Sequence, residues 1–213
     1  MQGLRALWRL MRVTLWALRG WWRARRHFPR LDAAAQAREV EQWARHMLTL
    51  MGIEVRIEGT PAKGPVLMAA NHISWLDILV MHASRHCRFV AKSEIRHWPL
   101  VGALTTAGQS LYIERASSRD AMRVVHRMRD ALLDGDVLGV FPEGSTGRGE
   151  ELGEPSFAPC YVDDDTLLGS IWRTLSAPAL LACVRYGVPQ SADGRSRRQW
   201  AEDVRASIKL LLK

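Results

Sequence analysis

Acidic side chains are absent from the first 30 residues, a segment that contains eight arginines. The rest of the chain holds 22 basic and 22 acidic residues, so the formal net charge of +8 belongs to the N-terminal segment alone. A basic segment without acids is typical of contact with an anionic membrane surface or with nucleic acid. The balanced remainder indicates an ordinary globular part.

Cysteine is scarce, with only Cys87, Cys160 and Cys183 in 213 residues. Their number is odd, they are widely spaced, and no C-x-x-C pair occurs. This pattern excludes a disulfide framework and the usual zinc spacings, and it favours a reducing compartment. The chain also lacks internal repeats. Its length and its 47% hydrophobic content fit a single globular domain of ordinary size.

Long apolar runs are missing from the N-terminal segment, because Arg12 and Arg19 enclose only six uncharged residues. This excludes a signal peptide and an ordinary membrane span. On a helical projection six arginines share an arc of roughly 100°: Arg5, Arg9, Arg12, Arg19, Arg23 and Arg26. Most of the remaining helix surface is leucine, alanine, valine, methionine and tryptophan. The pattern predicts a helix in the membrane interface, with arginines on headgroups.

Two alternatives remain for this helix. It packs against its own domain, or it binds nucleic acid, which its tryptophan-rich and leucine-rich face disfavours. A second helix is expected over residues 31–52 and ends at Gly52. The two helices predict an N-terminal, amphipathic, membrane-docking hairpin over residues 1–52. The second predicted domain covers residues 53–213.

Strands and helices alternate after residue 52. Apolar or alternating runs predict strands, and amphipathic runs predict helices between them: strands at 53–59, 64–71, 87–95, 109–115 and 136–144, helices at 74–84 and 117–135. This order predicts an α/β fold with a mostly parallel central sheet flanked by helices. Ligands in such sheets bind beyond the carboxyl ends of the strands. His72, Arg115 and Glu143 each follow a predicted strand.

The pattern Asn71-His72-x4-Asp77 interrupts an apolar run. A neutral imidazole can take a proton from an attacking alcohol, and a carboxylate on its other nitrogen fixes the tautomer. The alternative is structural: Ser74 and Asp77 fit a capping box, and the backbone then satisfies His72.

Two further strand ends carry polar groups. Arg115 can bind a phosphate with its guanidinium, or it is a surface arginine paired with Asp120 or Glu114. The run from Phe141 to Gly147 includes Pro142 and Gly144, which build a tight turn. The backbone N–H groups of Gly144, Ser145 and Thr146 can bind anionic oxygens, and Glu143 can position the backbone or an arginine. The alternative is that the run is a simple turn.

In this order, Asn-His-x4-Asp, Ile-x-Arg and Phe-Pro-Glu-Gly resemble the lysophospholipid acyltransferase family, the 1-acylglycerol-3-phosphate acyltransferase group, over about residues 60–147. The resemblance implies that His72 is the general base and that Asp77 orients it. Arg115 and Lys92 (in "FVAKSE") would bind the acceptor's phosphate. Glu143 and Gly144, with the neighbouring Ser145 and Thr146, would shape the acceptor site.

The resemblance implies acyl transfer from acyl-carrier protein or acyl-CoA to lysophosphatidic acid, yielding phosphatidic acid for phospholipid biosynthesis. Neither a metal nor a bound cofactor is expected. The expected partners are the acyl donor, the lysophospholipid acceptor and membrane lipids, not nucleic acid. The expected location is peripheral or monotopic, on the cytoplasmic face of the inner membrane.

The chain departs from the family after residue 147, where about one helix and one strand are missing and an exposed sheet edge is expected. This departure keeps open the alternative that the chain is a catalytically impaired, membrane-binding relative. Two further alternatives remain: the acceptor is another lysolipid such as lyso-ornithine lipid, or the His-Asp pair activates water and the chain is a thioesterase.

Overall fold

The computed structural model describes residues 2–113, 118–142, 158–160 and 166–212. The described strands lie close to the predicted ranges: β1 (Ile53–Glu58), β2 (Val66–Ala69), β3 (Arg88–Lys92), β4 (Leu111–Ile113), β5 (Val137–Val140) and β6 (Leu180–Arg185). Every strand pairing among them is parallel. The predicted α/β class with parallel strands is therefore confirmed.

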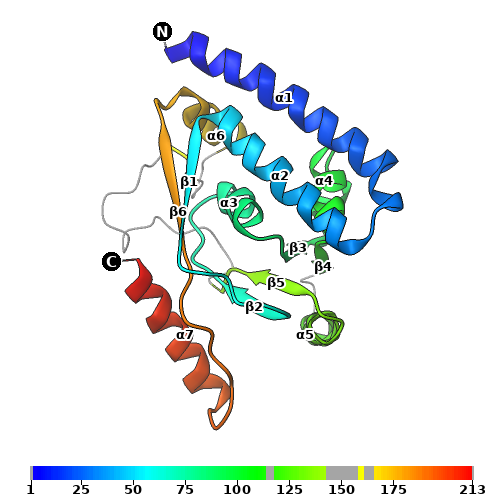
Figure 1. Ribbon diagram of the computed structural model, residues 1–213, viewed down its shortest axis with the longest axis vertical. Helices are drawn as coiled ribbons and strands as arrows, with labels where there is room; N and C mark the ends of the chain where they lie inside the picture. Colours follow the sequence, from blue (N-terminus) through cyan, green and yellow to red (C-terminus); the bar gives the residue numbers. More distant parts are fainter. Residues whose placement is uncertain (1, 114–117, 143–157, 161–165, 213) are drawn as a thin grey trace.

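The described strands form two sheets rather than one central sheet. One has the order β2-β5-β3-β4, and the other is the pair β1-β6. In the described part of the chain no ladder joins the two sheets, which are instead linked by helix packing (Figure 1). The predicted loss of a helix and a strand falls after residue 147, outside the described residues, and stays a prediction.

Helices surround the strands. The described helices are α1 (Gln2–Arg26), α2 (Ala33–Met51), α3 (Leu76–Ser84), α4 (Val101–Ala107), α5 (Ser118–Leu133), α6 (Leu167–Ser176) and α7 (Arg197–Leu211), with short 3-10 turns η1 (Phe28–Arg30) and η2 (Ser93–His97). Helices α1 and α2 run side by side along one edge of the molecule, and α7 lies at the opposite end (Figure 1). Helix α3 packs beneath α2 and against β1 and β6.

The main core lies where α1, α2, α3 and α6 meet the β1-β6 pair. Leu48, Leu76, Val80 and Leu175 are buried there together with other apolar side chains. A second, smaller cluster lies between α5 and the four-stranded sheet: Leu111, Ala131 and Leu138. Each cluster covers one sheet, which explains how two separate sheets remain in one molecule.

The two N-terminal helices are present as predicted. Asp32 begins α2 by accepting a hydrogen bond from the Ala35 N–H, and Gly52 ends it in the left-handed conformation, with φ 78°. Helix α1 approaches α2 closely at Gly20, where a Cβ would lie 2.3 Å from the indole nitrogen of Trp43. Asp32 and Gly52 therefore fix the ends of α2, and the small Gly20 fixes the contact between the two helices.

Helix α1 packs on the protein with small residues and with Leu10, Val13 and Trp16, and it exposes a second set of large apolar side chains to solvent. Seven large side chains with three- and four-residue spacing are 46–76% exposed: Leu4, Leu7, Trp8, Met11, Leu15, Leu18 and Trp22. Within the described helices none is long and apolar enough to cross a bilayer. An apolar face left open on a helix that is otherwise packed is unusual for a soluble surface.

The arginines of α1 are divided between the protein and the solvent. The Arg9 guanidinium donates to carbonyl oxygens at and just beyond the end of α6, at 3.0 Å from Leu175, 2.6 Å from Ala177 and 2.8 Å from Pro178. Arg23 donates both to Oε1 of Glu39, at 2.7 Å, and to Oε2, at 3.2 Å. Part of the predicted arginine stripe thus holds α1 on its own domain, because α6 and α2 offer it carbonyl and carboxylate acceptors.

Candidate active site

His72 and Asp77 meet beyond the carboxyl end of β2. Nδ1 of His72 lies 2.9 Å from Oδ2 of Asp77, and the two side chains are 16% and 21% exposed. An ionised carboxylate accepts the Nδ1–H, so this bond selects the tautomer in which Nε2 carries the lone pair. Nε2 is then the atom that can take a proton from a hydroxyl group.

The local backbone explains why these two side chains converge. After β2 the Ala70 N–H still bonds to the carbonyl of Val140 in β5, and the chain then turns before α3 begins at Leu76. Oδ2 of Asp77 accepts from the N–H of Ile73 at 2.8 Å and of Ser74 at 2.9 Å. Asp77 therefore fixes the loop and also bonds to His72, so the structural and the catalytic interpretations of the motif are compatible.

A column of aromatic rings supports the imidazole of His72. The Phe141 ring stacks on it, with centroids 3.9 Å apart and an interplanar angle of 12°. Phe89 in β3 stacks next, 5.5 Å from Phe141 at 10°. Gly139 makes room for this column, because a Cβ there would lie 2.7 Å from Cε1 of Phe89. Asp77 fixes one edge of the imidazole and Phe141 fixes its plane.

Two histidines, the buried His82 and the partly buried His86, complete the column below Phe89. His82 meets the Phe89 ring edge-on at 5.1 Å, and His86 stacks on His82 at 5.3 Å. The Nδ1 atoms of both are buried without a hydrogen-bond partner among the described residues. Burial, together with nearby His86, lowers the pKa of His82 to about 3, and burial lowers the pKa of His86. Because both pKa shifts favour the neutral form, His82 is uncharged at neutral pH.

The segment 158–160 is attached to the loop that carries His72. The buried Ser74 hydroxyl donates to the carbonyl of Pro159 and accepts from the Leu76 N–H at 3.1 Å. Ser170 in α6 donates to the same carbonyl at 3.1 Å, and Arg173 donates to the Cys160 carbonyl at 2.9 Å. Helix α6 therefore helps position the His72 loop from a distance of almost 100 residues.

The sequence interpretation gave no role to Ser74 beyond a cap, and none to Phe89 or to the ring of Phe141. Short-range signals existed only for two of them: Ser74 lies two residues after His72, and Phe141 opens the Phe-Pro-Glu-Gly run. Phe89 carries no such signal, because only the pairing of β3 with β5 brings it next to Phe141.

The structure describes three of the eight predicted site residues: His72, Asp77 and Lys92. Lys92 ends β3, at the same edge of the four-stranded sheet as the ends of β2 and β5, and its side chain is exposed. The others lie outside the described residues: Arg115, Glu143, Gly144, Ser145 and Thr146. Their convergence with His72 stays a prediction.

A metal-binding group is not found among the described residues, where no three histidine, cysteine, aspartate or glutamate side chains are grouped suitably. The described chemistry is that of a paired histidine and carboxylate at the carboxyl edge of parallel strands. This arrangement has the geometry that general-base activation of a hydroxyl group requires.

The family model described as Acyltransferase matches residues 52–160, just over half of the chain. The chain therefore belongs to the acyltransferase family. The matched segment begins at the end of α2 and includes β1 to β5, the His72-Asp77 pair and the ring column.

Curated relatives fall into two groups by name. The lyso-ornithine lipid O-acyltransferase of Rhizobium meliloti is 38% identical over 52% of this chain, and that of Pseudomonas aeruginosa is 27% identical over 92%. The 1-acyl-sn-glycerol-3-phosphate acyltransferase of Neisseria gonorrhoeae is 27% identical over 76%. The chain spans 38% of the length of the Rhizobium relative, 86% of the Pseudomonas relative and 75% of the Neisseria relative.

The crystal structure of the 1-acyl-sn-glycerophosphate (LPA) acyltransferase PlsC from Thermotoga maritima has the same fold, with a TM-score of 0.61. The two chains are 18% identical, and the similarity covers 96% of each. At this identity the likeness establishes the architecture alone.

Proposed function

We propose that the chain transfers a fatty acyl group from acyl-CoA or acyl-carrier protein to the free hydroxyl of a lysolipid. The 2.9 Å bond between Nδ1 of His72 and Oδ2 of Asp77 is the observation that carries this proposal, because it prepares Nε2 as a base. Nε2 takes the proton of the acceptor hydroxyl while the oxygen attacks the thioester carbonyl. The carbon–sulfur bond then breaks, and the imidazolium returns the proton to the leaving thiolate.

No covalent acyl-enzyme and no bound cofactor enter this reaction scheme. Asp77 stabilises the imidazolium that forms on His72, and Phe141 holds the imidazole plane. Lys92 lies at the edge of the sheet where the acceptor would bind, and it supplies a positive charge for a phosphate. Arg115 and Glu143 are proposed as further acceptor-binding groups on the basis of the motif alone.

Lysophosphatidic acid is the proposed acceptor, because the side chains of Lys92 and Arg115, both predicted to bind the acceptor, carry positive charges that suit a phosphate. Lyso-ornithine lipid is a second candidate, favoured by the names of the Rhizobium and Pseudomonas relatives. The two acceptors are distinguished by competition for one labelled acyl donor. The true acceptor is the one that is acylated when both lysolipids are present at equal concentration.

The proposed location is the surface of a membrane, peripheral or monotopic and on its cytoplasmic face. The exposed apolar face of α1, which includes Trp8, Leu15 and Trp22, supports this location, since such a face suits the boundary between headgroups and acyl chains. Trp8→Asp with Leu15→Asp is expected to reduce binding to anionic vesicles strongly without changing the melting temperature. Binding that is unaffected by the double substitution would contradict the proposed role of α1.

Acyl transfer to each lysolipid by purified protein in mixed micelles tests the reaction. His72→Ala is expected to lower kcat by at least about 100-fold, the usual contribution of a positioned base. His126→Ala is the matched control, because His126 is an exposed histidine of α5. Transfer that persists in His72→Ala would contradict the role of His72.

Two other results would favour a different function. Vesicle binding without any transfer or thioester hydrolysis would identify a catalytically impaired relative. Release of free fatty acid that does not depend on an acceptor would identify a thioesterase.

A further inference from the structure

A cavity of about 630 Å³ lies between the carboxyl end of α1, η1 and the η2–α4 segment. Aromatic and apolar side chains form most of its wall, among them Trp21, Phe28, Trp98 and Leu100. No described residue of the candidate active site lines it. Its size is typical of a site for a small ligand, and its place makes it a site separate from His72.

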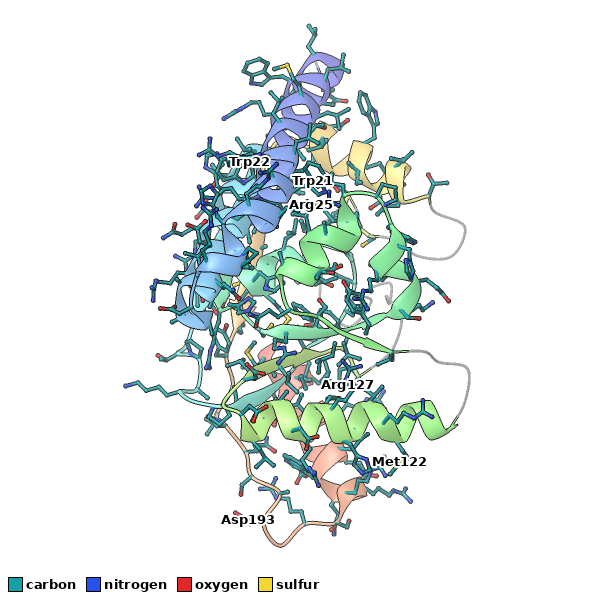
Figure 2. All side chains as sticks on the ribbon, turned by 90° about the vertical axis from the view of Figure 1, so that its right-hand side faces the viewer. Trp21, Trp22, Arg25, Met122, Arg127 and Asp193 are labelled. Atoms are coloured by element: carbon teal, nitrogen blue, oxygen red, sulfur yellow. The ribbon has the colours of Figure 1, made fainter. Side chains whose placement is uncertain are left out.

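Two arginines without acidic partners line this cavity. Arg25 comes from α1 and Arg96 from η2. Neither side chain makes a hydrogen bond or an ion pair with another described residue. The Arg25 guanidinium lies 4.4 Å from the Trp21 ring centroid, and that of Arg96 lies 5.7 Å from the Tyr112 centroid. Figure 2 shows Trp21 and Arg25 beside α4. No aspartate or glutamate is among the described lining residues.

Both guanidinium groups lie within cation–π distance of an aromatic ring. The planar fork of a guanidinium matches two phosphate oxygens. Because no acidic side chain is among the described lining residues, the positive charge of the cavity is free to bind an anion.

Backbone strain occurs in the wall of the same cavity. Leu100 has φ 63° and ψ −56°, and the Val101 N–H donates to the Pro99 carbonyl at 2.6 Å. This is a classic γ-turn, a rare and strained conformation for a residue with a side chain. Next to the turn, Gly102 lets α4 lie close against η2, because a Cβ there would lie 2.1 Å from the Arg96 carbonyl oxygen. Such strain is characteristic of binding sites, where a fixed wall matters more than local stability.

The surroundings of the cavity indicate a lipid rather than a soluble anion. Trp98 in its wall is 48% exposed, and Trp22 on the neighbouring turn of α1 is 52% exposed. Exposed tryptophans prefer the headgroup level of a membrane. The apolar face of α1 would bring this cavity to that level.

We propose that the cavity binds one anionic phospholipid of the membrane on which the protein lies. Its phosphate contacts Arg25 and Arg96, and its glycerol and first methylene groups contact Phe28, Trp98 and Leu100. The site rests on the proposed membrane position of α1 and not on acyl transfer, so it can be tested without an activity assay.

Binding is measured on the full chain in neutral detergent with three probes: dioctanoyl phosphatidylglycerol, dioctanoyl phosphatidylcholine and inorganic phosphate. Saturable binding of one phosphatidylglycerol is expected, counted by native mass spectrometry and titrated by calorimetry. Phosphatidylcholine and inorganic phosphate are expected to bind at least about tenfold more weakly, a difference of about 1.4 kcal/mol.

Two variants and one control assign the binding to this cavity. Arg25→Gln with Arg96→Gln is expected to weaken phosphatidylglycerol binding at least about tenfold. Ala103→Phe keeps both arginines but fills the cavity, and it is expected to weaken binding equally. Arg26→Gln with Arg30→Gln removes two exposed charges at the same end of α1 that do not line the cavity, and it is expected to leave binding unchanged.

Three results would overturn the proposal. Equal loss of binding in the Arg26/Arg30 control would show general electrostatic attraction. Equal affinity for phosphatidylcholine would show that the headgroup charge is not recognised. Equal affinity for inorganic phosphate would show a site for a soluble anion. Melting temperatures of the variants establish that each is folded.

Discussion

Buried His82 makes the stability of the fold depend on pH. Its pKa in the folded protein is lowered to about 3, mainly by burial and secondly by His86, whereas an unfolded histidine has a pKa of about 6.5. Between these values the unfolded chain binds a proton that the folded chain does not. The free energy of unfolding therefore falls as pH falls below about 6.5 and is fully present above it.

The size of this effect follows from the two pKa values. At pH 5 the unfolded histidine is almost fully protonated, and the proton stabilises the unfolded state by about 2 kcal/mol relative to pH 7.5. For a chain of this length a loss of about 2 kcal/mol lowers the melting temperature by about 4–8 °C. His86 acts in the same direction through burial, and nearby Glu41 and Asp136 oppose that effect.

Melting temperatures at pH 7.5 and pH 5 are compared for the wild type and for His82→Leu. The substitution keeps a side chain of similar volume in the buried site and removes the titratable group. The drop in melting temperature between the two pH values is expected to be about 4–8 °C smaller in the variant. His126→Leu, at an exposed position of α5, is the control. An equal drop in the wild type and in His82→Leu would refute the assignment of the effect to His82.

Three further substitutions test other contacts. Phe141→Leu removes the ring stacked on His72 and is expected to lower kcat about tenfold without raising KM, since an aromatic pair contributes about 0.5–1.5 kcal/mol. Phe141→Tyr should retain most of kcat. A change confined to KM would refute this role of Phe141. Gly139→Ala is expected to lower the free energy of unfolding by about 1–3 kcal/mol, because a Cβ would lie 2.7 Å from the buried ring of Phe89. An unchanged melting temperature would contradict this close packing. Arg9→Gln removes hydrogen bonds to three carbonyl groups and is expected to lower the free energy of unfolding by about 2 kcal/mol in thermal unfolding. The control Arg26→Gln should lower it far less.

The His72-Asp77 pair was predictable from the sequence because it is local. Asp77 follows His72 by five positions, and the turn between a strand and a helix brings the two side chains together. The strand and helix ranges were predictable for the same reason, since apolar alternation and the end signals at Asp32 and Gly52 act within a few residues.

The column of rings was not predictable, because its members come from β3, from α3 and from the segments that follow β2, α3 and β5. Phe89 and Phe141 are 52 positions apart, and β3 beside β5 brings their rings together. The link from α6 to the His72 loop through Ser170 has the same origin. Contacts of this kind depend on sheet order and helix packing, for which a single sequence holds no local signal.

The sequence by itself determined the class of fold, the paired base at the end of β2 and the split of α1 into basic and apolar sectors, because each follows from spacing along the chain. Only the tertiary structure decided which sector of α1 faces the protein. It also placed Arg25 and Arg96 in one cavity and divided the described strands into two sheets. These outcomes depend on which acceptors and surfaces the distant elements α2, α4 and α6 offer, and those exist only after the chain has folded.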